Sequence, residues 1–489
     1  MSKKWIIALL FMFTMAASVK AQSADDVLRY SLEYPSYDPV SLVMPSVSAA
    51  TGFGAYQANP AAMALFDDSF FSFDLSTRFV NESAAYLGNT SDFSDNQTNI
   101  GNIGFVYKVP TVQGSLVIGG GYSQTTDFNR AFSVSGFNEF STITDFYAYL
   151  PRTDSLNVAA YNVFAIEDVN ADSSVSIFRL GFPFSAYPGI SQDVEVVEEG
   201  RIGEYSAFFA TELLKNLSVG VSIGYLTGTY SYRREFLESD RRGLYDGQFI
   251  DSDGDGDFDT DIDNIYSVST ITAELEAFSA RLGFVYEPIE NLSIGASYEF
   301  PASFRINELY NTQITTTFDN GVQYSDEAPG RFIYTIVRPE RLKAGFTLES
   351  DDGFVFSASA EAVPYSEGRI EFNELELNPL ENEINSTVES NLNDVINLRA
   401  GLALKVNDRF IPRVGYAYFP APQDEAGSAR QFISGGFSAE LTKGLVLDVG
   451  LQYSFWEDQN VLYSTPRVFE VVQEDVSRIH AMFGVKMAL

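Results

Sequence analysis

The acidic segment DSDGDGDFDTDID, residues 251–263, carries the clearest pattern of chemical groups in the chain. Its carboxylates include Asp251, Asp253, Asp255 and Asp259. Calcium loops place oxygen ligands at alternate positions with a glycine at the turn, and Gly256 stands at that place here. The twelfth position is Ile262, where an EF-hand has a bidentate glutamate. Two interpretations stay open: a structural calcium ion in an external loop, and a solvated acidic loop tip.

Groups that perform catalysis are scarce. The chain has no Cys and one His, His480, near its end. A hydrolase of the Ser-His-Asp type needs an oriented histidine beside its nucleophile, and no spacing of Ser and Asp around His480 indicates one. We find no phosphate-binding glycine loop and no Cys/His cluster for a metal. We therefore expect no enzyme, and no cofactor other than the calcium ion.

The elements that must position these groups show a two-residue period. In NLSVGVSIGY, residues 216–225, large apolar residues alternate with Ser and Gly, and 291–300 and 444–455 repeat the pattern. Such alternation puts successive side chains on opposite faces of a β-strand. A soluble sandwich and a membrane barrel both produce it.

Three features favour the barrel. The alternation often persists for about 9–11 residues, the span of a tilted membrane strand. Short and long connections alternate along the chain, and aromatic residues such as Tyr225 and Tyr298 gather toward strand ends, as in an interfacial girdle. Charges of both signs, including Asp74, Lys343 and Glu361, fall on the opposite faces, where a water-lined lumen tolerates them and a sandwich core does not.

We therefore predict an all-β fold, a closed transmembrane antiparallel barrel of about 14 strands over residues 69–489. Its last strand is an alternating one that includes Ile479 and Phe483. The expected long external loops are about 81–99, 125–201, 232–267, 308–329, 367–393, 421–427 and 458–474. The expected strands are near 69–80, 100–109, 114–124, 202–213, 216–231, 268–287, 291–307, 330–350, 353–366, 394–405, 409–420, 428–441, 444–457 and 475–488.

The N-terminus precedes this pattern. Lys3 and Lys4, an apolar run and a small-residue site before Ala21 predict a secretory signal peptide over 1–21, hence export. The net charge of −35 disfavours nucleic acid as a partner. Residues 22–68 mix Pro, Gly and aromatics, with a short helix expected near 24–32, and are predicted to plug the lumen.

Two motifs resemble a known family. Asn59-Pro60-Ala61, directly ahead of the first strand, resembles the signature in the hatch of FadL/TodX-type outer-membrane transporters. RVGYAYFPAP, residues 413–422, is similar to a late strand of those proteins. The resemblance implies a bacterial outer-membrane channel for passive uptake of long-chain fatty acids or other hydrophobic compounds. It also implies capture of the ligand by external loops and release through a lateral opening.

Several residues are candidates for these roles. Gly119, Gly120 and Gly121 interrupt the third strand, and we expect them to kink it and make the opening, or else to pack beneath a bulky lumen side chain. Expected ligand contacts are Phe53 and Tyr56 in the plug and Phe146 and Tyr149 in the long loop. The loop aromatics could equally form a small core that covers the barrel mouth.

The expected partners are outer-membrane lipid, lipopolysaccharide and a hydrophobic ligand, with the protein as a monomer. Two alternatives to the transporter remain. One is a barrel of the same architecture that serves as a carrier or assembly component for protein secretion, and the other is a general porin.

Overall fold

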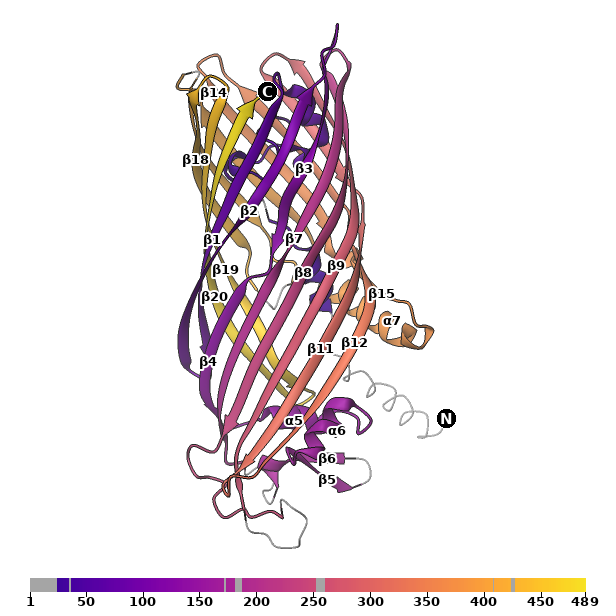
Figure 1. The fold of residues 1–489 in the computed structure, drawn as a ribbon, viewed down its shortest axis with the longest axis vertical. Coiled ribbons are helices and arrows are strands. Elements are labelled where there is room, and N and C mark those ends of the chain that lie inside the picture. The colour runs from indigo at the N-terminus through magenta and orange to yellow at the C-terminus, as the bar shows by residue number, and fades with distance from the viewer. Residues whose placement is uncertain are drawn as a thin grey trace, which may run out of the picture.

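The computed structural model describes residues 24–34, 37–170, 173–180, 187–251, 260–407, 409–423 and 427–489. The expected signal peptide lies outside these residues. One antiparallel sheet curves into a tall closed barrel, with its short turns at one end and most of its long connections at the other (Figure 1). Within the described ranges, no helix has the length and apolar character required to cross a bilayer.

The barrel has fourteen strands, as predicted. Its sheet contains eighteen segments, and four pairs of these are consecutive pieces of one barrel strand. Two of the interruptions fall at Pro301 and Pro339, which have no N–H for the ladder. Pairing of β1 with β20, which sets Phe70 opposite Ala488, closes the ring. The strands are β1 (Phe70–Tyr86), β2 (Asn89–Lys108), β3 and β4 (Leu116–Asp127, Arg130–Asn138), β7 (Ile190–Leu214), β8 (Leu217–Ser239), β9 (Ile262–Ile289), β10 and β11 (Leu292–Glu299, Ala302–Phe318), β12 and β13 (Gln323–Arg338, Arg341–Glu349), β14 and β15 (Phe354–Pro364, Arg369–Phe372), β16 (Asp394–Leu404), β17 (Phe410–Phe419), β18 (Arg430–Thr442), β19 (Leu445–Thr465) and β20 (Val468–Ala488).

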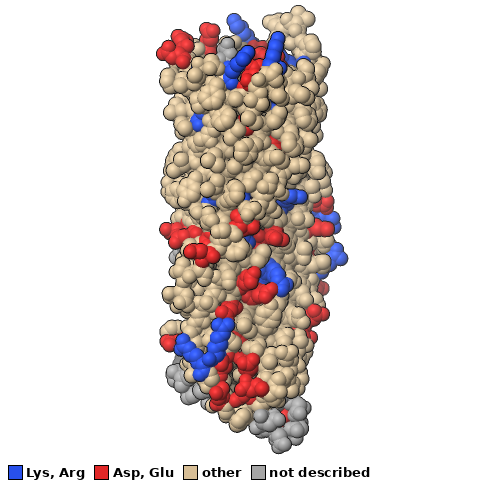
Figure 2. All heavy atoms as spheres, turned by 60° about the vertical axis from the view of Figure 1, so that its left-hand side comes forward, with Lys and Arg blue, Asp and Glu red and all other residues tan. Residues whose placement is uncertain are grey.

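The alternation has the orientation that the sequence predicts. In β8, Ser218 and Ser222 face inward and are buried, while Val221 and Ile223 point outward with 43% and 65% of their surface exposed. Figure 2 shows the consequence, a broad belt with few charged side chains near the short-turn end and many charges toward the other end. Such a belt matches the hydrocarbon layer around an outer-membrane barrel.

The external loops are shorter than expected, because the strands continue far beyond the apolar belt. β1 and β2 join at the tight turn Leu87-Gly88, so the expected loop 81–99 is mostly strand. Polar residues occupy both faces of this region, for example in NTSDFSDNQT, and thus remove the hydrophobic period while the backbone still pairs. The same correction reduces the expected loops 125–201, 232–267, 308–329 and 458–474 to about 139–189, 240–261, 319–322 and 466–467.

Short helices occupy the lumen ahead of the first strand. They are α2 (Ala24–Ser31), α3 (Pro39–Val43), α4 (Ala55–Ala58) and the 3-10 helix η1 (Pro60–Leu65). The expected helix near 24–32 is confirmed by α2. Asp38 caps α3 with Pro39 in its first turn, and the Asp38 carboxylate also accepts from Gly54 N at 2.9 Å. We call residues 24–68 the plug.

The long loop after β4 folds over the external end of the barrel (Figure 1). It contains α5 (Ile143–Tyr149), α6 (Ser155–Asn162), the hairpin of β5 (Ile166–Asn170) and β6 (Ser173–Ser176), and the 3-10 helix η2 (Ile177–Arg179). The 3-10 turn η4 (Tyr365–Glu367) leads into the segment expected as loop 367–393. This segment holds β15, a second 3-10 turn, η5 (Leu375–Leu377), and α7 (Asn378–Asn391).

Candidate functional site in the barrel lumen

The hatch motif Asn59-Pro60-Ala61 fastens the plug to the barrel wall. Asn59 caps η1 by accepting from Ala61 N at 2.9 Å, and its amide donates to Val47 O in the plug and Phe284 O in β9, at 2.7 and 2.9 Å. The wall has glycine where it contacts this motif, because a larger residue would clash: a Cβ at Gly283 would lie 1.9 Å from Asn59 Oδ1. A Cβ at Gly220, in the stretch 216–225, would lie 2.5 Å from Ala61 N. The small residues on the inner faces therefore make room for the plug.

Phe53 and Tyr56 are fully buried between plug and wall. Tyr56 stacks on Phe208 of β7 with ring centroids 5.2 Å apart, and Phe53 lies 6.2 Å from the same ring. Tyr56 OH is 3.5 Å from Ser123 Oγ in β3. These contacts pack the plug against the wall, and the expectation that Phe53 and Tyr56 contact a ligand stays a prediction.

The other two expected ligand residues lie at the external end. Phe146 packs against a large apolar cluster formed by the loop after β4 and the outer ends of the strands, whereas Tyr149 is 39% exposed. The structure thus places the four aromatic candidates in two separate regions. Most of the loop's apolar side chains form a core over the barrel mouth, and a few point outward.

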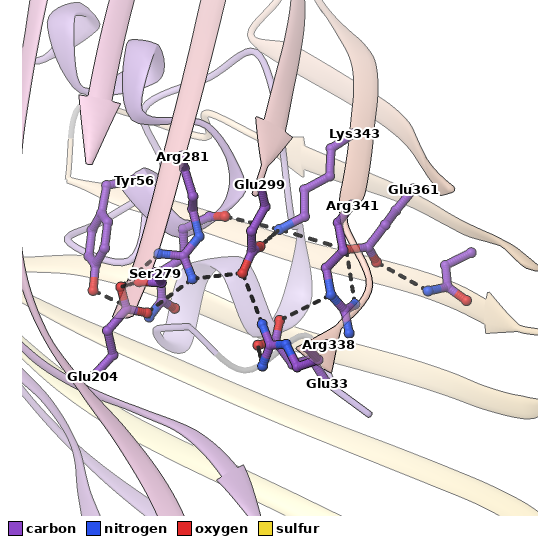
Figure 3. A network of polar contacts seen from close by, with 12 residues as sticks. Glu33, Tyr56, Glu204, Ser279, Arg281, Glu299, Arg338, Arg341, Lys343 and Glu361 are labelled. Atoms are coloured by element: carbon purple, nitrogen blue, oxygen red, sulfur yellow. Dashed lines mark hydrogen bonds and ion pairs between the residues drawn. The ribbon is translucent and has the colours of Figure 1, made fainter. Parts of the chain in front are cut away.

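A buried ion network joins the plug to the wall in the middle of the lumen (Figure 3). Its carboxylates are Glu33, Glu204, Glu299 and Glu361, and its cations are Arg281, Arg338, Arg341, Lys343 and Arg399. The side chains of all nine are 6% exposed or less. Burying so many charges is unfavourable unless each is paired, so the network fixes its members in one arrangement.

Glu299, at the end of β10, is the centre of the network. Its carboxylate lies 3.2 Å from Arg281 of β9, 2.9 Å from Arg338 of β12 and 3.4 Å from Lys343 of β13. Glu361 makes the corresponding contacts with Arg341, Lys343 and Arg399.

The plug enters this network at several points, including a hydrogen bond of 3.4 Å that the Gln57 side chain donates to Glu204. Glu33 binds Arg338 at 2.6 Å, Lys343 donates to the backbone oxygen of Gln57 at 3.0 Å, and Arg341 donates to that of Ser31. The sequence pattern had put Lys343 and Glu361 on the inner face, but Glu33 and Glu299 were missed. Glu299 has one sequence signal, a charge at the end of an apolar strand, whereas Glu33 lies after α2 in a segment without a strand period.

The structure does not place the kink of the third strand at Gly119–Gly121. These glycines lie in an unbroken ladder with β2 and β7, where a Cβ at Gly119 would meet Phe208 and one at Gly121 would lie 2.2 Å from Ile103 O. They are thus packed beneath bulky neighbours, the alternative reading of this motif. Strand β3 separates from β2 only after Ser123, and a bulge against β7 follows between Gln124 and Thr126.

Beyond this point lies a seam, defined by residues 89–101 of β2 on one side and β4 on the other. Among the described residues, this part of β2 has ladder pairs with β1 alone, and β4 has them with β7 alone. Side chains bridge the seam instead: Asn89 donates to Ser135 O at 2.8 Å, and the Asn129 amide donates to Gln97.

Of the predicted calcium ligands, Asp251 is described, and Asp253, Asp255 and Asp259 lie outside the described residues. Three nearby carboxylates, those of Asp246, Asp261 and Asp319, have oxygens within 4.8 Å of one another. The calcium hypothesis stays a prediction, and titration calorimetry of the purified protein tests it.

The crowding of these carboxylates gives a prediction on pH. Partial burial and the neighbouring Asp261 carboxylate raise the pKa of Asp319 to about 6. Because the folded pKa lies above the ordinary value of 3.8, the ionised form opposes folding of the loop, and stability rises as pH falls through 6 toward 4. We expect larger amide-exchange protection factors in residues 240–251 and 317–323 at about pH 5 than at about pH 7.5. Asp319→Asn should remove this difference, and equal pH dependence in the variant would contradict the prediction.

Comparisons with known proteins agree with this architecture. Residues 204–481 match the family model described as outer membrane protein transport protein (OMPP1/FadL/TodX). The P. putida toluene transporter TodX is 13% identical, with 93% of this chain and 99% of that chain covered and a TM-score of 0.55. A Pseudomonas aeruginosa FadL homologue is 11% identical, with 93% and 98% covered and a TM-score of 0.53. The comparison with curated proteins gave no match.

At these identities the solved structures establish the fold, whereas the family model covers more than half of the chain. The family description names outer membrane transport proteins, in agreement with the expectation that the protein is not an enzyme and resides in the outer membrane. The chain belongs to the OMPP1/FadL/TodX family of outer membrane transport proteins.

Proposed function

We propose that this outer-membrane channel for hydrophobic compounds takes up long-chain fatty acids, or apolar molecules of similar shape, without an energy source. The observation that carries the proposal is the filled lumen. Apolar cores occupy its external and middle levels, and the plug is held among them by polar contacts. Once the plug moves, such cores offer an apolar ligand apolar surfaces to contact, whereas they offer ions and sugars no water-filled path. The filling disfavours a general porin.

The ligand first meets the external end. Phe140, Tyr149 and Tyr161 of the loop after β4 are 77%, 39% and 44% exposed there. Exposed aromatic side chains beside an apolar core form a surface on which an alkyl chain loses its contact with water. This surface is the proposed place of capture.

We place the lateral exit at the seam between β2 and β4. Opening the wall between two strands that share a ladder breaks backbone hydrogen bonds, each of which must be replaced, whereas the seam is held by side chains. It begins near Tyr122 and Tyr205, whose rings are 5.1 Å apart at the edge of the apolar belt. A ligand that leaves at this lower end of the seam reaches the edge of the hydrocarbon layer.

A disulfide across the seam tests this exit. We expect the oxidised double variant Gln97→Cys/Asn129→Cys to lose uptake of a fluorescent long-chain fatty acid, and a reducing agent to restore it. The matched control is Thr77→Cys/Thr98→Cys, which joins β1 to β2 where the ladder is continuous and the hydroxyls are 3.0 Å apart. Unchanged uptake in the oxidised seam variant would show that the ligand leaves by another path.

The function itself is tested in cells that lack their own fatty-acid channel. Expression of the chain should restore uptake of labelled fatty acid, and lipids that co-purify in mild detergent should include molecules with alkyl tails. If uptake is absent and a secreted protein co-purifies instead, the barrel is a secretion component.

A further inference from the structure

A second group of charged side chains lines the lumen at the inner side of the seam, apart from the network of Figure 3. We call it the arginine pocket. It encloses a cavity of about 20 Å³ lined by Tyr34, Arg78, Thr125, Thr126, Asp127, Arg430, Phe432, Gln452, Ser454, Trp456, Arg478 and His480. Three guanidinium groups and one carboxylate therefore face the same small space. Tyr34 comes from the plug, and the other residues come from the wall.

The charges of the arginine pocket are not balanced. Asp127 Oδ2 lies 2.7 Å from Arg78, and His480 binds Ser76 at 2.8 Å. Arg430 and Arg478 form no ion pair with any described carboxylate. Their guanidinium groups lie against aromatic faces instead, with Arg430 4.2 Å and Arg478 5.5 Å from the Trp456 ring.

Two buried donors in the pocket have no acceptor among the described residues. They are Arg478 Nε and Trp456 Nε1, and Trp456 is only 8% exposed. A buried donor without an acceptor is unfavourable, and more so beside an unpaired guanidinium. Donors and positive charge together indicate an anion.

The carboxylates next to the arginine pocket, those of Glu82, Asp458 and Glu474, contact Arg130. Arg130 lies 3.4 Å from Glu82 and also pairs with Glu474, with Asp458 at 3.6 Å. Arg130 is thus the cation in direct contact with these three carboxylates, and none of them forms an ion pair with Arg430 or Arg478.

The size of the cavity and its surroundings define the anion. About 20 Å³ holds one or two water-sized groups, which suits the two oxygens of a carboxylate better than the four of a phosphate. Tyr34, Phe419 and Phe432 form an aromatic cluster directly beside it, with ring centroids 5.1–6.5 Å apart. An alkyl tail attached to the carboxylate finds an apolar wall there.

We propose that Arg78, Arg430, Arg478 and Trp456 bind the carboxylate of an amphiphilic acid on its way to the seam. The inference rests on the proposed function and selects among its ligands: acids are preferred to neutral compounds of equal length. Because Asp127 holds Arg78 and belongs to the junction of β3 and β4, a bound carboxylate competes with it for Arg78 at the seam itself.

The chain offers its own probe for this site. Its two tryptophans are Trp5, in the expected signal peptide, and Trp456, in the arginine pocket. A Trp5→Phe background leaves Trp456 as the only tryptophan, whether or not the expected signal peptide has been removed. We expect palmitate to change its emission and to bind more tightly than hexadecanol, which has the same tail without the charge.

In the same background, Arg430→Gln/Arg478→Gln should weaken palmitate binding about tenfold and leave hexadecanol binding unchanged. Arg430→Lys/Arg478→Lys should keep much of the preference, and Arg409→Gln, an exposed arginine at a turn, should keep all of it. Equal affinity for the two ligands, or palmitate binding unaffected by the Gln substitutions, overturns the arginine pocket and leaves the proposed function standing. If neither ligand binds, both fail.

Discussion

A disulfide between positions 48 and 347 is expected to stop transport. Ser48 Oγ of the plug lies 2.8 Å from Thr347 Oγ1 of β13, close enough for two cysteines at these positions to bond. Since the plug fills the lumen and touches the wall through its backbone, we expect a ligand to pass only when the plug moves. Oxidised Ser48→Cys/Thr347→Cys protein should take up fatty acid no faster than cells without the channel, and reduction should restore uptake.

The chain contains no native cysteine that could form competing bonds. The control Thr315→Cys/Ser325→Cys joins paired residues of β11 and β12, whose hydroxyls are 3.0 Å apart, and should transport normally in both redox states. Normal uptake by the oxidised plug variant would mean that the ligand passes a stationary plug, and the proposed path would have to be abandoned.

The fold could be predicted from the sequence because lipid demands apolar side chains at every second position. That demand ends with the hydrocarbon layer. Above that layer, residues such as Asp92 and Gln97 lie in regular strands, but their polar side chains are equally compatible with a solvated loop. The sequence therefore does not show where these strands end. The interruptions of the barrel strands at Pro301 and Pro339 were missed for a related reason: an interrupted strand keeps its alternation on both sides.

The site depends on long-range register, which one sequence does not contain. The pattern placed Lys343 and Glu361 on inner faces, and the pairing of β13 with β14 then sets these two residues opposite each other. One partner of Arg338, however, is Glu33, which lies far away in the sequence, in a segment without periodicity. The three-glycine run shows the same limit, since only the neighbouring strands reveal whether it bends or packs.

The strongest test of the ion network is the substitution Glu299→Gln. It leaves Arg281, Arg338 and Lys343 with one carboxylate fewer in a region that water does not reach. Removing one partner of a buried ion pair costs about 3–5 kcal/mol, and we expect a loss in the lower part of this range because each cation retains another carboxylate. Urea-induced unfolding in lipid vesicles, followed through Trp456 fluorescence, measures this loss in the free energy of unfolding.

Two further variants separate the network from a general effect of losing a charge. Glu276→Gln removes a carboxylate whose partner Arg305 is 63% exposed, and should change stability by less than about 1 kcal/mol. Glu299→Gln/Lys343→Met removes one charge of each sign and restores the balance of the network, so it should be more stable than Glu299→Gln alone. If Glu299→Gln costs no more than Glu276→Gln, the network does not anchor the plug, and the plug is held by its packing against the glycines of the wall.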